Sequence, residues 1–293
     1  MNDILMPLLK IALVIFMAGN LLDMGLRLNP QDALRGLRDP RFVALTLVWG
    51  FVVGPALAYA ITLVVPLETP YAIGLVLIAM TPCAPFLPAM VHKAGGDLGS
   101  TAAFMLLTAA AMVVFMPFAV PVMVTGLTVD AWAIAKPLLM VILLPLAIGM
   151  MILHASPASA ASLQPFVKKT TTLATIALAA LSIAVYGKDL LGVKGELALA
   201  AQIVFFLVVT TLPYWFGFGL PHEQKIVLSV GMASRNVGAA LAPLFSVPGM
   251  DERAIVMVVL GFPVMVGFAF LSTKWFGHPA ATDDPGVASS VPH

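Results

Sequence analysis

The stretch TPCAPFLP (Thr81–Pro88) follows the apolar run Gly74–Met80 and interrupts it with three prolines in eight residues. Each proline removes a backbone N–H donor and clashes with the preceding turn, so a regular helix cannot continue through this stretch unchanged. A second interruption lies far along the chain. There the run Ile226–Val230 is followed by GMASRNVG (Gly231–Gly238), which is polar, bounded by glycines and carries the full charge of Arg235.

The composition around these two stretches is that of an integral membrane protein. Apolar residues make up 61% of the 293 residues, charged residues only 10%, and the mean hydropathy is +1.03. A soluble domain usually carries about 25% charged residues. The net charge of +1 and the lack of a basic block give no reason to expect a nucleic-acid partner. Cys83 is the only cysteine, which excludes an intrachain disulfide and a cysteine-based zinc site.

At about 20 apolar residues per span, the chain is expected to form nine transmembrane helices in one all-helical unit over residues 1–277. The expected spans are Ile4–Leu28, Phe42–Val65, Tyr71–Val91, Leu98–Thr125, Trp132–His154, Phe166–Tyr186, Leu197–Gly219, Ile226–Phe245 and Arg253–Trp275. Residues 278–293 change to Ala, Asp, Pro, Gly and Ser, which predicts a disordered cytoplasmic tail.

Both interruptions fall inside expected spans, the third and the eighth. Unsatisfied backbone groups are costly in lipid, so broken helices persist only inside protein or beside a water-filled cavity. The third and eighth spans are five spans apart, and because five is odd, a unit repeated at this interval re-enters the membrane inverted. Interrupted helices at corresponding places in inverted repeats point to the binding site of a transporter. We expect a first repeat of four helices over residues 1–127 and a second repeat of five helices over residues 128–277. The first repeat would thus lack one leading helix.

Lysine and arginine are distributed unequally between the two expected sides of the membrane. Nine lie on the side of the loop after the first helix, five lie on the opposite side, and Arg235 falls within the eighth span. Because positive residues accumulate on the cytoplasmic side, the N-terminus is expected outside and the C-terminus in the cytoplasm. The expected location is the cell inner (plasma) membrane.

Three motifs are spread along the chain. They are Met24-Gly25-Leu26 with Asp32 downstream, the Pro82-centred break followed by Gly96-Asp97, and Val230-Gly231-Met232 leading to Ala239–Ala242. In these motifs the chain resembles bacterial members of the bile acid:sodium symporter family, which commonly have ten helices. The resemblance covers about residues 10 to 275 and implies a panel domain, a core domain, and two discontinuous helices that cross near the midplane. It also implies organic-anion substrates, such as bile acids, sulfated steroids or pyruvate-like carboxylates.

At most positions where the resemblance implies a sodium ligand, this chain lacks the side-chain oxygen that would bind the ion. Where the resemblance implies a Ser-Asn pair, this chain has Leu87 and Pro88, and where it implies a glutamate, the chain has Ser229. Ala233 and Gly50 replace two glutamines. Of two hydroxyl residues, one is replaced by Met105 and the other is kept as Thr101. Hard cations need several carboxylate, carbonyl or hydroxyl oxygens. We therefore expect the chain not to use the family's usual sodium sites, and we expect no other metal or cofactor.

Arg235 falls where the family would hold bound cations. Burying an arginine at mid-membrane costs about 2.5–3.5 kcal/mol on insertion scales, so it should have a partner. Acids within the spans are scarce, and Asp23 lies one helical turn from Arg27, with which it can pair. We hypothesise that the Arg235 guanidinium supplies a permanent positive charge, which either balances the half-helix ends or pairs with an anionic substrate.

The other candidate binding residues each have a purely structural alternative. Serine and asparagine can cap a half-helix, threonine can bond to its own helix, prolines can kink a span, and a cysteine can fill apolar space. The candidates besides Arg235 are Asn236, Ser234, Ser229, Met232, Pro82, Cys83, Thr101 and Asn20.

We expect secondary transport of a small organic anion by a monomer or weak dimer in the lipid bilayer. No histidine lies at depth and no second buried acid is evident, so we expect no enzyme. An auxin-efflux-type carrier or an arsenite exporter would share the crossed-helix plan, and the latter would be expected to use a cysteine such as Cys83. A non-transporting membrane receptor is the remaining alternative.

Overall fold

The computed structural model describes residues 2–28, 30–123, 131–190, 193–246, 251 and 253–277. Within these residues all regular secondary structure is helical, and the only β-type pairing is one isolated bridge. Within the described residues, six helical segments are long and apolar enough to cross a membrane. They lie in α1 (Asn2–Gly25), in Pro40–Val64, in α7 (Leu98–Met123), in Ala131–Ala155, in α11 (Val193–Trp215) and in α14 (Arg253–Phe276). The expectation of an all-helical multi-pass membrane protein is confirmed.

Two of these six segments contain a widened π-helical turn. Pro40–Val64 consists of α3 (Pro40–Leu47), the turn Val48–Val53 and α4 (Gly54–Val64), and Ala131–Ala155 consists of α8 (Ala131–Leu138), the turn Leu139–Leu143 and α9 (Leu144–Ala155). Such turns often occur at functional sites. The sequence did not reveal either of them.

Both interrupted spans are divided into two shorter helices. The first consists of α5 (Thr69–Ala79) and α6 (Leu87–Ala94), and the second of α12 (His222–Ala233) and α13 (Val237–Ser246). In the first break Cys83 has a φ of 85°, and it is the one non-glycine among the described residues with positive φ. An L-residue rarely adopts this left-handed conformation, so the break is locally strained.

The two breaks meet and pair with each other. The Cys83 N–H donates to the Ser234 carbonyl, and the Asn236 N–H donates to the Thr81 carbonyl, each at 2.8 Å. Pro82 and Arg235 thereby form an antiparallel bridge. This pairing gives hydrogen-bond partners to backbone groups that have none within the broken helices. Such partners are required in lipid, where no water can replace them.

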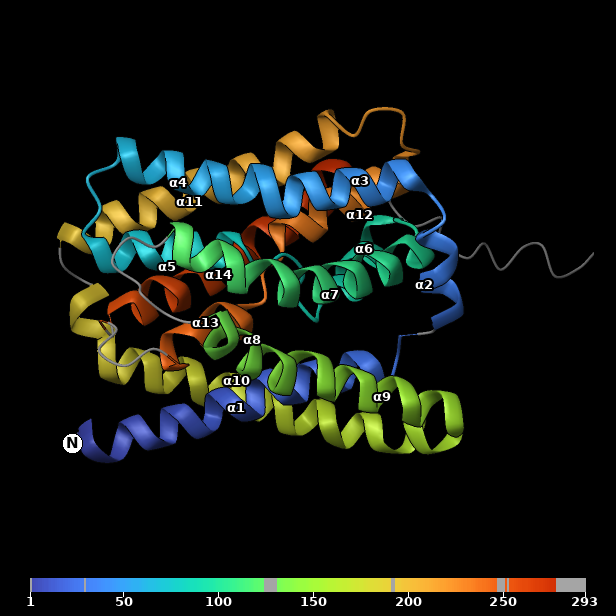
Figure 1. Cartoon of the computed structure of the whole chain (residues 1–293), viewed down its shortest axis with the longest axis horizontal. Helices are drawn as coiled ribbons and strands as arrows, with labels where there is room; N and C mark the ends of the chain where they lie inside the picture. Colours follow the sequence, from blue (N-terminus) through green and yellow to red (C-terminus); the bar gives the residue numbers. More distant parts are fainter. Residues whose placement is uncertain are drawn as a thin grey trace, which may run out of the picture.

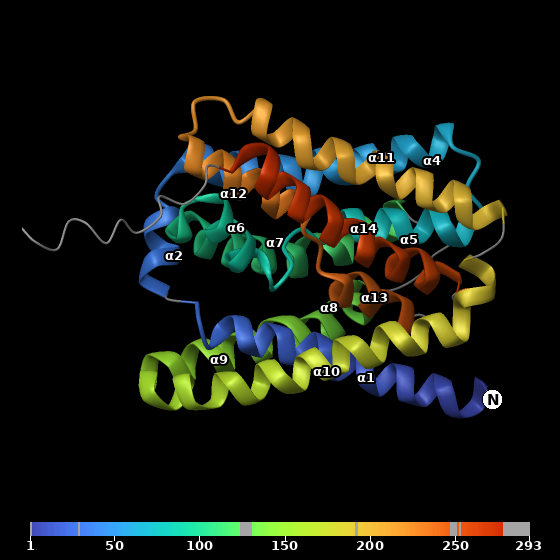
Figure 2. The ribbon, with the colours of Figure 1, turned by 180° about the vertical axis from the view of Figure 1, so that it is seen from behind.

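The helices form a layered bundle around this crossing. In both views α1, α9 and α10 (Pro157–Leu190) form a layer along one side, and α3, α4 and α11 lie along the opposite side (Figures 1 and 2). The broken helices, α7 and α14 lie between them. In the first layer α1 contacts α10 and α9 closely. A Cβ atom added to Gly25 would lie 2.3 Å from the Leu146 carbonyl oxygen, so only glycine permits this approach of α1 to α9.

The outward faces carry large exposed apolar side chains. Val64 is 84% exposed, Val122 80% and Phe166 69%. Large exposed apolar side chains on several helices suit contact with lipid. The lipid bilayer expected as a partner is therefore consistent with the surface of the molecule.

Several helix ends differ from the expected ones. α10 begins at Pro157, nine residues before the expected Phe166, because Ser156 accepts a hydrogen bond from the Ser159 N–H at 3.2 Å and Pro157 suits the first turn. A short helix, α2 (Pro30–Gly36), occupies what was expected to be a loop. The expected junction of the repeats at residues 127–128 and the tail 278–293 lie outside the described residues.

Candidate functional site

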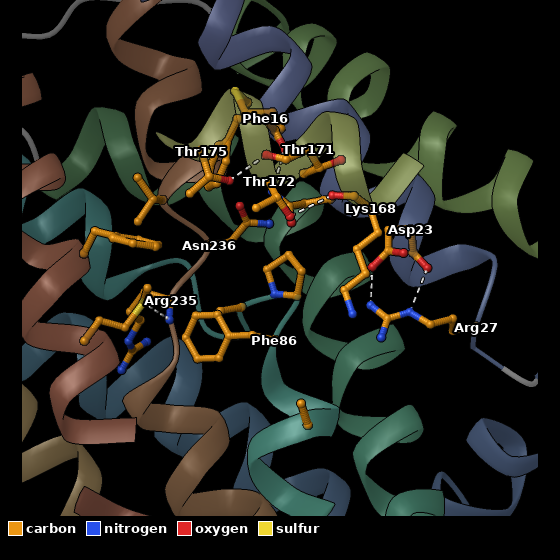
Figure 3. A pocket seen from close by; sticks show the side chains of 18 residues that line it. Phe16, Asp23, Arg27, Phe86, Lys168, Thr171, Thr172, Thr175, Arg235 and Asn236 are labelled. Atoms are coloured by element: carbon orange, nitrogen blue, oxygen red, sulfur yellow. Dashed lines mark hydrogen bonds and ion pairs between the residues drawn. The ribbon is translucent and has the colours of Figure 1, made fainter. Parts of the chain in front are cut away.

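A cavity of about 240 Å³ lies beside the crossing, between the layer of α1 and α10 and the broken helices (Figure 3). Its walls come from α1, α10, α14 and both breaks. The lining residues are Phe16, Met17, Asn20, Asp23, Arg27, Ala84, Pro85, Phe86, Ala89, Lys168, Thr171, Thr172, Thr175, Arg235, Asn236, Val237, Phe262 and Met265. The structure thus brings together three predicted site residues, Asn20, Arg235 and Asn236.

Asn236 both caps a helix and lines the cavity. Its Oδ1 accepts a hydrogen bond from the Ala239 N–H at 3.1 Å, which caps the N-terminus of α13. Its side chain also reaches toward the α10 threonines (Figure 3). The first turn of α13 therefore begins at the cavity wall.

Arg235 is 1% exposed and is the largest fully buried side chain among the described residues. Its guanidinium points away from Asn236 and the cavity (Figure 3). Nη1 donates to the Ala79 carbonyl at 3.0 Å, at the C-terminus of α5. Its carbon Cζ lies 5.2 Å from the centre of the Phe205 ring.

The partners of Arg235 within the described chain are thus a helix end and an aromatic ring, and no acid pairs with it there. Nε and Nη2 have no hydrogen-bond partner within the described chain. Cationic groups interact favourably with the negative C-terminal end of a helix. Of the two hypothesised roles, this geometry matches the one in which the guanidinium balances a half-helix end.

The backbone of the widened turn Val48–Val53 and of α4 approaches the crossing at glycines. A Cβ atom at Gly50 would lie 3.1 Å from Pro82 Cγ, and one at Gly54 would lie 3.6 Å from Arg235 Nη2. Larger side chains here would crowd the crossing or the guanidinium. These two glycines leave room for Arg235 and Pro82.

The remaining predicted site residues do not line this cavity. The hydroxyls of Ser229, Ser234 and Thr101 donate to the carbonyls of Thr210, Val230 and Asp97 at 2.6, 2.7 and 2.7 Å. Thr101 thus bonds to its own helix end, whereas neither serine caps the N-terminus of a half-helix through this bond. Met232, Pro82 and Cys83 are buried at the crossing or in the helix that leads to it. Asn20 lines the cavity, although its Nδ2 donates to the Phe16 carbonyl at 2.7 Å.

The cavity has two cations, Arg27 and Lys168, and one acid, Asp23, in its wall, while the charged end of Arg235 points away from it. Asp23 is 5% exposed, and its two oxygens accept from Arg27 and, at 2.8 Å, from Gln164 Nε2 of α10. Lys168 is exposed and has no ion pair within the described chain.

Lys168 and the three threonines of α10 were not among the predicted site residues. The available signal was the polar run Lys168–Thr172 within an otherwise apolar helix. In the sequence, Lys168 contributed only to the distribution of positive residues that predicts the orientation in the membrane. No group of three or more potential metal-ligating His, Cys, Asp or Glu residues occurs in the described part of the chain.

Two broken helices that cross beside a charged cavity, in a multi-pass helical bundle, define a membrane protein of the transporter class. Residues 12–196 match the model of the Sodium Bile acid symporter family, and the chain belongs to this family. The resemblance inferred from the sequence is confirmed. Since this is a family of transporters, the expectation that the chain is not an enzyme is confirmed as well.

Among characterised sequences the chain is similar to chloroplast proteins of plants. It is 24% identical over 259 residues to "Probable sodium/metabolite cotransporter BASS2, chloroplastic" of Oryza sativa subsp. japonica, covering 85% of this chain and 61% of the relative. It is 22% identical over 257 residues to the BASS3 protein of the same description from Arabidopsis thaliana, covering 84% and 59%. The chain thus spans about 60% of the length of these relatives.

Proposed function

We propose that the chain is a secondary transporter that carries small organic anions across a membrane through the cavity beside the crossing. The single observation that carries this proposal is the charge of the cavity wall, in which the charged side chains of Arg27 and Lys168 lie near one acid, Asp23. The named relatives are sodium/metabolite cotransporters, which supports transport of a small metabolite.

The size of the cavity favours a small carboxylate over a steroid. Its volume of about 240 Å³ lies below the range of about 300–1,000 Å³ that is typical of pockets for drug-sized ligands. Pyruvate and benzoate are small enough for such a space, whereas a bile acid is much larger. Within the substrate classes of the family, we therefore propose small monocarboxylates.

The anion would lie between the N-termini of α6 and α13 on one side and Lys168 on the other. Phe86, which precedes α6, and Val237, which begins α13, both line the cavity. Helix N-termini carry partial positive charge, and half-helices in transporters direct them at anionic substrate groups. Lys168 of α10 supplies a full positive charge from the opposite wall.

We also propose that transport does not use the family's usual sodium sites. The Arg235 guanidinium already places a positive charge at the C-terminus of α5, where the negative helix end would otherwise attract a cation. Ser229, which stands for the family's glutamate, donates its hydroxyl to the Thr210 carbonyl. The crossing therefore has a fixed cation and few free oxygen ligands.

The alternatives have less support. An arsenite exporter would need an accessible thiol, but Cys83 is 6% exposed and does not line the cavity. A receptor without transport would not need two broken helices beside a cavity. Auxin-efflux-type carriers share the crossing of two broken helices, but the family model that matches this chain is that of the Sodium Bile acid symporter family.

The finer architecture remains a proposal. Counting the two broken spans and α10 with the six apolar segments gives the nine expected helices. We propose that α1, α8, α9 and α10 form the panel domain and the other spans the core. The inverted repeats of residues 1–127 and 128–277, the outside N-terminus and the plasma membrane location belong to the same proposal.

The full chain in proteoliposomes tests this function. Uptake of radiolabelled pyruvate and benzoate is measured beside taurocholate, a bile acid. We expect uptake of the small anions only, and Lys168→Gln should raise their KM roughly tenfold through loss of a charged contact. Lys169→Gln is the matched control, because Lys169 is adjacent and does not line the cavity. The proposal is wrong if neither small anion is taken up, or if both variants behave alike.

A further inference from the structure

A second cavity, of about 280 Å³, lies between α1, α2, α6 and α7. Its wall includes Asp32, Pro88 and Thr101, none of which lines the cavity beside the crossing. Arg27 lines both cavities. Its side chain therefore lies where an anion would pass from one cavity to the other.

The ion pair of Arg27 is unequally exposed. The Arg27 side chain is 41% exposed, whereas the Asp23 side chain is 8% exposed. Arg27 uses Nη2 for the Asp23 carboxylate and Nε for the Asp23 carbonyl at 3.3 Å. A guanidinium has five N–H donors in a planar fork that suits carboxylates, so Arg27 has donors left for a second anion.

Asp23 keeps a partner of its own when Arg27 turns to another anion. Gln164 Nε2 of α10 donates to Asp23 Oδ1 at 2.8 Å, and this bond does not depend on Arg27. Lys168 lies one helical turn further along α10 and lines the same cavity, with its side chain directed toward Asp23 and Arg27 (Figure 3). The end of the cavity near Asp23 thus has two cations for one carboxylate.

Resting on the proposed function, we propose that the Arg27 guanidinium pairs alternately with Asp23 and with the carboxylate of the transported anion. The substrate carboxylate replaces Asp23 on the guanidinium as it passes between the two cavities. Asp23 then pairs with Arg27 again, which releases the substrate. Asp23 acts as an internal competitor that keeps the anion from remaining bound.

This exchange predicts opposite effects on the KM of a single and a double variant. Asp23→Asn removes the competitor, so the KM for pyruvate should fall and the maximal rate should fall with it, because release becomes slow. Asp23→Asn/Arg27→Gln removes both charges and should raise the KM roughly tenfold or more. The double variant avoids the unpaired buried carboxylate that Arg27→Gln alone would leave.

Arg38→Gln is the matched control, since Arg38 is exposed and lines neither cavity. Uptake is measured in proteoliposomes, pyruvate binding by thermal shift, and folding by size-exclusion chromatography. The charge-reversed pair Asp23→Arg/Arg27→Asp should transport poorly.

Two results would overturn the inference. One is a double variant with the KM of the wild type, and the other is a charge-reversed pair that transports normally, which would make the ion pair merely structural. If the wild type takes up no small anion, the proposed function itself fails. If the wild type transports and the double variant transports equally well, only the role of Arg27 fails.

Discussion

Replacing Arg235 with methionine removes the charge at the crossing while keeping an unbranched side chain. The interactions lost are the charged hydrogen bond to the Ala79 carbonyl at 3.0 Å and the contact with the Phe205 ring at 5.2 Å. The first is worth about 1.5–3 kcal/mol and the second about 2 kcal/mol when desolvated. The burial cost of about 2.5–3.5 kcal/mol is relieved at the same time.

These effects nearly cancel, so Arg235→Met should lower the free energy of unfolding by only about 1 kcal/mol and at most about 2.5 kcal/mol. Transport should nevertheless be lost, because the half-helix end at Ala79 no longer has its cation. Unfolding in detergent measures the first quantity, and pyruvate uptake into proteoliposomes measures the second. Arg235→Lys keeps the charge without the planar fork and should retain part of the uptake.

A variant that unfolds far more easily yet still transports would refute this reasoning, because Arg235 would then serve the fold alone. Unchanged uptake by Arg235→Met at normal stability would also refute it. Arg235→Gln, which keeps a donor without a charge, should behave like the methionine variant in transport.

Three further predictions concern single positions. Asp251 lies outside the membrane spans, and hydrogen bonds from Arg253 hold its carboxyl pKa below the usual range. Its contribution to stability is therefore present above the ordinary pKa and is lost as the pH falls through the lowered pKa. Asp251→Asn should remove this part of the acid sensitivity in melting curves. Cys83→Val should lower stability by about 1–3 kcal/mol because the φ of 85° excludes a β-branched residue, whereas Cys83→Gly should not. Gly25→Ala should cost about 1–3 kcal/mol through overpacking of α1 on α9, whereas Gly267→Ala, with nothing within 4 Å of the added Cβ, should cost little.

Both helix breaks could be predicted because their causes are local. Three prolines within Thr81–Pro88, and a charged polar run within Gly231–Gly238, are incompatible with a continuous helix in lipid. The crossing of the two broken helices was expected from the resemblance. Their backbone pairing, Cys83 to Ser234 and Asn236 to Thr81, was not predicted, because it depends on contacts between distant segments.

The direction of a side chain could not be predicted in the same way. Arg235 and Asn236 are neighbours in one polar run, yet the guanidinium points toward α5 and the asparagine toward the cavity. Lys168 was missed because its role depends on α10 lying beside the crossing, which no local pattern specifies. Ser229 and Thr101 were plausible ligands in the sequence, and their bonds to carbonyls became visible only in the structure.

The central claim is that a small organic anion crosses the membrane beside a crossing whose positive charge is Arg235 instead of bound sodium. The most direct test is pyruvate uptake by the wild type in proteoliposomes with equal sodium chloride, or equal potassium chloride, on both sides. We predict the same uptake in the two salts. Uptake that requires sodium would contradict the claim.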